Sequence, residues 1–150
     1  MGIDTDCVSY ISSIYGNKDD NICDMECTMW QVVLVVLAGV CKAIVDKISF
    51  HYYTSIFRNL RHRFWCPSES WKNKWMGGIK DNGERFLFSS TILVWVTDAW
   101  HLFQKLEYSF LFLAIVFYRP MINMVIDFML LYCVFTLVFE IFFRWVLSKK

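Results

Sequence analysis

Two long apolar runs constrain the fold of this chain more than any other feature of its sequence. Residues 30–45 contain only Gln31 and Lys42 as polar residues, and residues 46–50 complete a run of membrane-spanning length. Residues 121–147 are mostly Phe, Leu, Val, Ile and Met, with a few scattered polar positions. A helix of about 20 mostly apolar residues crosses the hydrocarbon core of a bilayer. Both runs therefore predict membrane-spanning helices.

The alternative to a membrane protein is a soluble helical bundle. Surface helices of such a bundle carry polar residues at a period of about 3.6, whereas the two runs are apolar all round. The whole chain of 150 residues is 57% hydrophobic and 19% aromatic, above the usual range for soluble domains. We therefore expect an all-α integral membrane protein with a single helical membrane domain at residues 29–150.

Residues 1–28 form an acidic tail ahead of the first run, with Lys18 as the only basic residue. This charge does not fit the positive start of a signal peptide, so the first run is expected to remain as a span. Cys7, Cys23 and Cys27 lie in the tail, and two of them could pair on an oxidising side of the membrane. A structural zinc site is not predicted, because a second ligand pair is missing.

Residues 51–86 form a basic and aromatic loop after the first run. Seven Lys and Arg residues stand against three acidic residues, so the positive-inside rule places this loop in the cytoplasm and the acidic tail outside. Indole rings among basic side chains suit the headgroup layer of a bilayer. We predict that the loop binds anionic lipid headgroups. The candidate residues are Arg58, Arg61, Arg63, Trp65, Trp71 and Trp75.

The basic cluster of this loop is not expected to bind nucleic acid. The net charge of the chain is only +1, which gives no domain-wide basic footprint. A short basic cluster beside a membrane span more often meets anionic lipid. The expected partner is therefore the lipid bilayer.

Residues 87–118 allow two topologies. Residues 86–103 could form a short span, but Lys105 and Glu107 interrupt it, and the eleven residues up to Tyr118 cover only about half a hydrocarbon core. Pro120 favours a break just before it. We expect three long helices, with spans at about 29–50, 87–118 and 121–147, and four spans are the alternative. Three spans would also place the basic C-terminus in the cytoplasm.

Asp98 and His101 lie one helical turn apart within an apolar stretch. An Asp near the centre of a span costs about 2.5 to 3.5 kcal/mol, roughly what the apolar residues of this stretch contribute. These two side chains therefore need polar partners or a position away from the membrane centre. Polar residues in spans usually face the bundle interior and mark functional sites by default. We expect a shared polar centre.

Three interpretations of this centre stay open, and the first is favoured. In the first, the ionisable groups pair with one another, as in a structural or accessory protein. The candidate pairs are Lys42 with Asp46 or Asp98, Asp98 with His101, and Arg119 with Asp127. In the second, a membrane-embedded enzyme uses Asp98 and His101 as catalytic residues with a divalent metal. The candidate metal ligands are Asp46, His51, Asp98, His101 and Asp127. In the third, the same groups line an ion or proton path.

Two segments are distinctive: "TDAWHLF" at residues 97–103, which is the more specific, and "SWKNKW" at residues 70–75. With these segments the chain resembles a family of small uncharacterised polytopic membrane proteins of bacteria and their viruses. Less distinctive matches are Asp46, His51, Tyr118, Pro120, Asp127 and Glu140. The resemblance covers roughly residues 30–147 and implies a polytopic membrane fold. It implies no substrate, because the family has no established activity. No Gly-x-x-x-Gly pattern identifies a contact face, so a homo-oligomer stays open.

Overall fold

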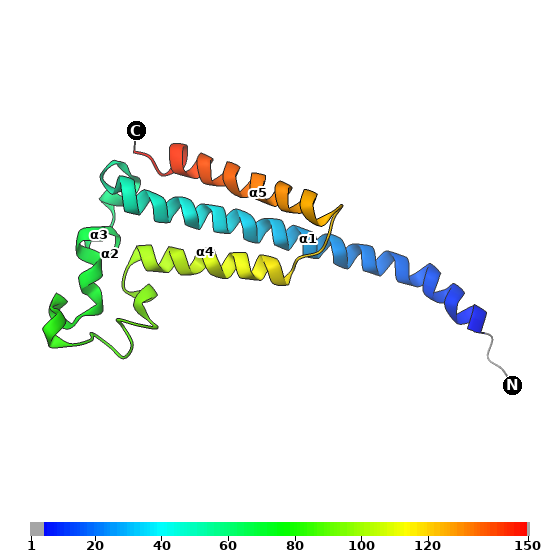
Figure 1. Ribbon diagram of the computed structural model, residues 1–150, viewed down its shortest axis with the longest axis horizontal. Coiled ribbons are helices and arrows are strands. Elements are labelled where there is room, and N and C mark those ends of the chain that lie inside the picture. The colour runs from blue at the N-terminus through cyan, green and yellow to red at the C-terminus, as the bar shows by residue number, and fades with distance from the viewer. Residues whose placement is uncertain (1–4, 150) are drawn as a thin grey trace.

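The computed structural model describes the backbone of residues 5–149 and the side chains of residues 28–149. Three long helices lie side by side, and a group of short helices covers one end of them (Figure 1). The long helices are α1 (Thr5–His51), α4 (Ala99–Val116) and α5 (Met124–Ile141). Residues 5–149 contain no β-strand and only two isolated β-bridges. The all-α prediction is confirmed.

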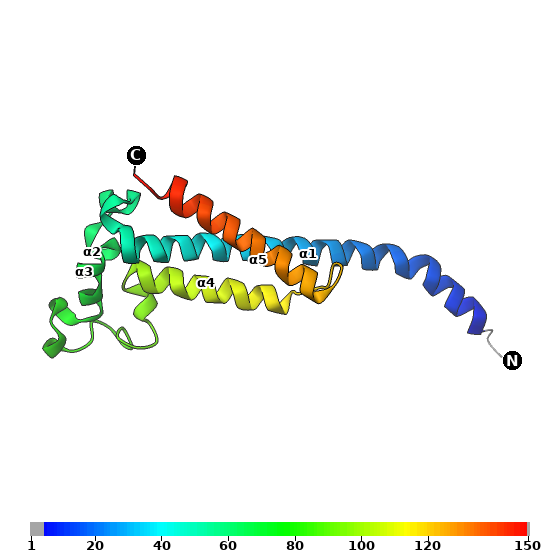
Figure 2. The same ribbon diagram turned by 45° about the horizontal axis from the view of Figure 1, so that its top comes forward.

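Helix α1 is the axis of the molecule and extends well past the other two helices at its N-terminal end (Figure 2). The acidic tail is therefore continuous with the first helix from Thr5 onward. Pairing among Cys7, Cys23 and Cys27 was left open above, and these cysteines lie outside the residues whose side chains are described. From residue 28 onward, α1 packs against both α4 and α5.

Small residues let α1 approach its neighbours closely. Ala38 and Ala43 are completely buried, and a Cβ atom at Gly39 would lie only 3.0 Å from the carbonyl oxygen of Phe135 in α5. Backbones in close contact through Gly and Ala are typical of helix pairs in membranes, where van der Waals packing drives association. Gly39 therefore lets the backbone of α1 approach that of α5 closely.

Helices α1 and α5 run in the same direction, and α4 runs against both (Figure 1). Next to the C-terminal ends of α1 and α5, Ile56 donates its backbone N–H to the carbonyl of Leu147 at 3.2 Å. At the other end, Gln31 of α1 and Met124 of α5 line the same groove. The α4–α5 turn and the short helices therefore lie at opposite ends of the bundle.

Residues 52–98, called the end region below, contain short helices joined by turns. The helices are η1 (Tyr52–Thr54), η2 (Ile56–Asn59), α2 (His62–Trp65), α3 (Pro67–Ser70), η3 (Trp71–Lys74), η4 (Met76–Gly78), η5 (Lys80–Asn82) and η6 (Val94–Val96). Aromatic packing holds the end region to the bundle. The Trp65 ring stacks on Phe57 at a centroid distance of 4.6 Å and lies 5.8 Å from Phe103 of α4.

Two helical segments are long and apolar enough to cross a membrane, by length and composition. They are Thr28–Thr54 and Met124–Val146, and the second continues α5 through the π-helix η7 (Phe142–Val146). The spans predicted at about 29–50 and 121–147 coincide with these segments. Helix α4 has 18 residues but is less apolar, because Gln104, Lys105 and Glu107 lie within it.

The helix predicted over residues 87–118 begins at Ala99 instead, so the first part of that prediction is wrong. Residues 87–98 form turns and the short η6, and Asp98 has an extended backbone with φ −150° and ψ 156°. A side chain that caps a helix N-terminus fixes where the helix starts, even when the preceding residues are apolar. The apolar segment before Asp98 is therefore not part of α4.

Candidate functional site

Asp98 is the N-cap residue of α4. Its Oδ1 accepts the backbone N–H of His101 at 2.9 Å, and its Oδ2 lies 2.7 Å from His101 Nδ1. The hydroxyl of Thr97 is 3.4 Å from Oδ2, and Asp98 is only 2% exposed. The polar pair that interrupts the apolar stretch is thus satisfied locally at a helix start. The predicted pairing of Asp98 with His101 is confirmed.

The five candidate metal ligands are not brought together. Asp98 and His101 lie at the start of α4 beside the end region, whereas Asp127 lies in the first turn of α5 at the opposite end. Asp46 forms an ion pair with Lys42 at 2.8 Å. Across residues 28–149, no three His, Cys, Asp or Glu side chains are placed to hold a metal ion. The candidate carboxylates instead serve local hydrogen bonds and ion pairs.

Asp127 closes the turn between α4 and α5. Its side chain is fully buried and accepts the backbone N–H groups of Met121 at 2.8 Å and Ile122 at 3.2 Å. The hydroxyl of Tyr118 donates to the same carboxylate at 3.2 Å. Among the ion pairs formed within residues 28–149, none joins Arg119 to Asp127, so the predicted pair is wrong. The backbone of the turn satisfies this carboxylate instead.

A cluster of charged side chains lies between α1 and α4. Lys42 pairs with Asp46, one of its two predicted partners, and Glu107 of α4 interacts electrostatically with both. Glu107 is only 9% exposed. One lysine therefore stands near two carboxylates on the packed face between two helices. In the sequence, Glu107 was noted only because it interrupts an apolar stretch. Its partners could not be predicted, because they depend on which face of α4 packs against α1.

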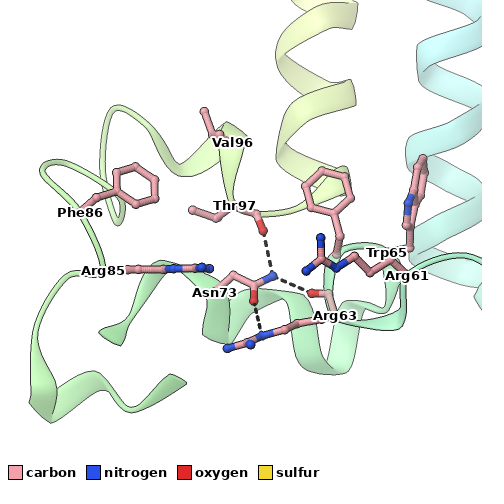
Figure 3. A pocket seen from close by; sticks show the side chains of 9 residues that line it. Arg61, Arg63, Trp65, Asn73, Arg85, Phe86, Val96 and Thr97 are labelled. Carbon is pink, nitrogen blue, oxygen red and sulfur yellow. Dashed lines mark hydrogen bonds between the residues drawn. The ribbon is translucent and has the colours of Figure 1, made fainter. Parts of the chain in front are cut away.

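A half-open pocket of about 350 Å³ lies in the end region beside the start of α4 (Figure 3). Its wall has three arginines, one buried amide and several apolar side chains. The lining residues are Arg61, Arg63, Phe64, Trp65, Asn73, Arg85, Phe86, Val96 and Thr97. No acidic residue lines it. The pocket therefore combines concave shape with positive charge.

Asn73 holds the wall of this pocket together. Its Nδ2 donates to the carbonyl oxygens of Arg63 at 2.6 Å and Thr97 at 2.9 Å, and its Oδ1 accepts Arg63 Nε at 3.0 Å (Figure 3). These bonds join α2, η3 and the residue that precedes the N-cap of α4. They also fix the guanidinium of Arg63. Sequence analysis missed Asn73, and its only signal was its place in "SWKNKW".

The three arginines of the pocket carry charge that no carboxylate offsets. Each is exposed, and within residues 28–149 none of Arg61, Arg63 and Arg85 has an Asp or Glu oxygen within 4.0 Å. Guanidinium groups match the oxygen geometry of phosphate and carboxylate, and a concave site concentrates their field. This arrangement can bind an anion. Sequence analysis missed Arg85, whose only signal was its place in the basic loop.

The other predicted headgroup residues lie outside the pocket. Of the six, Arg61, Arg63 and Trp65 line it, whereas Trp71 donates its indole N–H to the carbonyl of Ser68 at 2.9 Å. Trp75 lies under the Lys74 ammonium at 5.8 Å. These aromatic and basic side chains remain part of the same end region. Their binding to headgroups stays a prediction.

Comparison with protein-family models, with curated proteins and with solved structures gave no match for this chain. The resemblance to small polytopic membrane proteins of bacteria and their viruses therefore stays a prediction.

Proposed function

We propose that this chain is a three-crossing membrane protein with a structural or accessory role, whose end region binds anionic lipid headgroups on the cytoplasmic face. One observation carries the topology. Helices α1 and α5 are parallel, and both contain a segment of membrane-spanning length. Two spans that cross in the same direction need a return crossing between them, and α4 is the antiparallel helix that joins them.

Helix α4 has suitable dimensions for the return crossing. Its 18 residues extend about 27 Å, close to the thickness of about 30 Å of a hydrocarbon core. Glu107 is covered by the packed face with α1, near Lys42. Lys105 is exposed in the second turn, from which its long side chain can reach the nearby headgroup layer. Both charges are thus in positions that a membrane helix tolerates.

The exposed surface of α5 favours lipid over water as its surroundings. Only 6% of the residues in its most apolar window are buried, although the segment is rich in Phe, Leu, Val and Met. An apolar surface of this extent would be an aggregation site on a soluble monomer, whereas acyl chains would cover it in a bilayer. The soluble-bundle alternative is therefore disfavoured.

The charge distribution supports a cytoplasmic end region. One end of the bundle holds the basic residues 51–86 and the basic C-terminus. The acidic start of α1 extends from the opposite end. Leu87 and Ile92 of the same end region are 75% and 69% exposed. Exposed apolar and basic side chains next to each other suit the headgroup layer. Because Asp98 and His101 satisfy each other as a helix cap, we favour a structural role over a catalytic one.

Cysteine accessibility in intact cells tests this topology. We would replace the native cysteines by Ser and introduce one cysteine at a time at Ile122, in the α4–α5 turn, or at Lys80, in the end region. A maleimide that does not cross membranes should label Ile122→Cys in intact cells and Lys80→Cys only after permeabilisation. Labelling of both positions from the same side would show that α4 does not cross, and would overturn the proposal.

A further inference from the structure

The arginine pocket has a more specific chemistry than a basic surface. We propose that it binds a phosphate monoester, carried as the terminal phosphate of an anionic lipid headgroup. This inference rests on the proposed placement of the end region at the cytoplasmic face, and it names the headgroup that this region takes. It draws on the charge, the preorganisation and the apolar wall of the pocket.

Charge and donor geometry favour a monoester over a diester. Three guanidinium groups line one hollow, and within residues 28–149 no carboxylate pairs with them. Each guanidinium can donate to two phosphate oxygens in a planar fork. A terminal phosphate offers three free oxygens and between one and two negative charges at neutral pH. A phosphodiester has two free oxygens and one charge, so it would leave more of the arginine charge uncompensated.

The pocket is held in shape by its own hydrogen bonds. In Figure 3 the side chains of Arg61, Arg63 and Arg85 surround the buried Asn73. Asn73 occupies the Nε donor of Arg63, which leaves the terminal nitrogens of that guanidinium for a ligand. A preorganised donor loses less conformational entropy when it binds. Asn73 is therefore a positioning residue of the proposed site.

The remaining wall fits a phosphate attached to a lipid. Phe64, Trp65, Phe86 and Val96 supply apolar surface beside the arginines. A volume of about 350 Å³ is near the lower end of ligand pockets, so it suits a phosphate with its glycerol and not two acyl chains. The acyl chains would remain in the bilayer beside the exposed side chains of Leu87 and Ile92. A lipid-attached monoester would thus contact both the arginines and the apolar side chains of the pocket.

Calorimetric titration of the detergent-solubilised full-length protein tests the proposal. The probes are dihexanoyl phosphatidic acid as a lipid monoester, dihexanoyl phosphatidylglycerol as a lipid diester, and glycerol 3-phosphate as a soluble monoester. We expect phosphatidic acid to bind most tightly. Arg85→Gln and Arg61→Gln should each weaken its binding about tenfold, as expected for one lost charge-assisted contact. Lys80→Gln, which removes one positive charge from the end region outside the pocket, is the matched control and should change affinity little.

The outcomes separate the pocket from the general headgroup function. Equal weakening by Lys80→Gln and Arg85→Gln, or equal affinity for the two lipids, would overturn the monoester pocket and leave headgroup binding by the end region intact. Glycerol 3-phosphate binding as tightly as phosphatidic acid would overturn the assignment to lipid, because the apolar wall would then contribute nothing. No binding of either anionic lipid would overturn both this inference and the proposed headgroup function.

Discussion

The Asp98 carboxylate closes the first turn of α4 on His101, through the backbone N–H at 2.9 Å and the ring nitrogen Nδ1 at 2.7 Å. His101 stands at the third helical position, where a capping box has Glu or Gln. Its ring contacts the Asp98 side chain and not the backbone of the N-cap residue. This cap sets the start of α4 immediately beside the arginine pocket, because Thr97 belongs to the wall of that pocket.

Replacing Asp98 with Ala should destabilise the protein by about 1 kcal/mol, the usual loss for an N-cap acceptor. Unfolding in detergent, followed by circular dichroism, measures this change in free energy. Asp81→Ala, which removes the same group from the exposed η5, is the control and should have little effect. Stoichiometric metal in the purified protein, lost in both Asp98→Ala and His101→Ala, would contradict a purely structural role for the pair.

Asp127 should contribute more than a single cap. Asp127→Asn keeps the shape of the side chain but replaces charge-assisted hydrogen bonds from Met121 and Ile122 by neutral ones. We expect a loss of about 1 to 3 kcal/mol in the free energy of unfolding. Tyr118→Phe removes one donor and leaves both backbone bonds, so its effect should be smaller. A larger effect of Tyr118→Phe would show that the turn does not depend on the carboxylate.

The two long apolar helical segments could be predicted from sequence because apolar length alone decides them. Membrane-spanning helices need about 20 apolar residues whatever their neighbours are. The start of α4 could not be predicted in this way. Residues 87–97 carry no charge and are mostly apolar, and only the geometry of Asp98 shows that the chain turns before Ala99.

Only part of the candidate site could be predicted, because some of its residues are indicated by local composition and others are brought together by the fold. The basic and aromatic composition of the loop indicated Arg61, Arg63 and Trp65, whereas Arg85 and Asn73 enter the pocket only through the fold. Lys47 illustrates the same limit. It is buried and donates to the Phe143 carbonyl at 3.0 Å, 96 residues away in the sequence. Partners at such separation follow from helix packing and leave no local pattern.

Close packing at Gly39 leads to a test of the α1–α5 contact. A Cβ atom there would lie 3.0 Å from the Phe135 carbonyl oxygen and 3.4 Å from the side chain of Val138. Gly39→Val should therefore push the helices apart and cost about 1 to 3 kcal/mol, as overpacked sites do. The same detergent unfolding experiment measures it. Val33→Leu adds volume on an exposed position of α1 and should be nearly neutral; equal effects would mean that α1 and α5 do not pack as described.

Glu84 organises the turn that follows the basic loop. Its carboxylate accepts the backbone N–H groups of Phe88 at 3.0 Å and Ser90 at 3.3 Å, together with the Ser90 hydroxyl. Phe88 has a left-handed backbone with φ 61°, which a bulky residue adopts only when its surroundings hold it. The hydrogen bond from the Ser90 side chain is the main reason that the pKa of Glu84 lies below its ordinary value.

This lowered pKa predicts how the turn responds to pH. Because the folded turn favours the carboxylate form, its stabilising contribution is fully present above the ordinary pKa of a glutamate and is lost as the pH falls through the lowered pKa. A ¹³C NMR titration of labelled glutamate carboxyl groups measures the pKa of Glu84 directly. Ser90→Ala should raise this pKa toward the ordinary value. Thr91→Ala, one residue further on, should leave it unchanged, because the hydrogen bonds to the Glu84 carboxylate come from Phe88 and Ser90. An unchanged pKa in Ser90→Ala would show that the Ser90 hydroxyl does not stabilise the carboxylate.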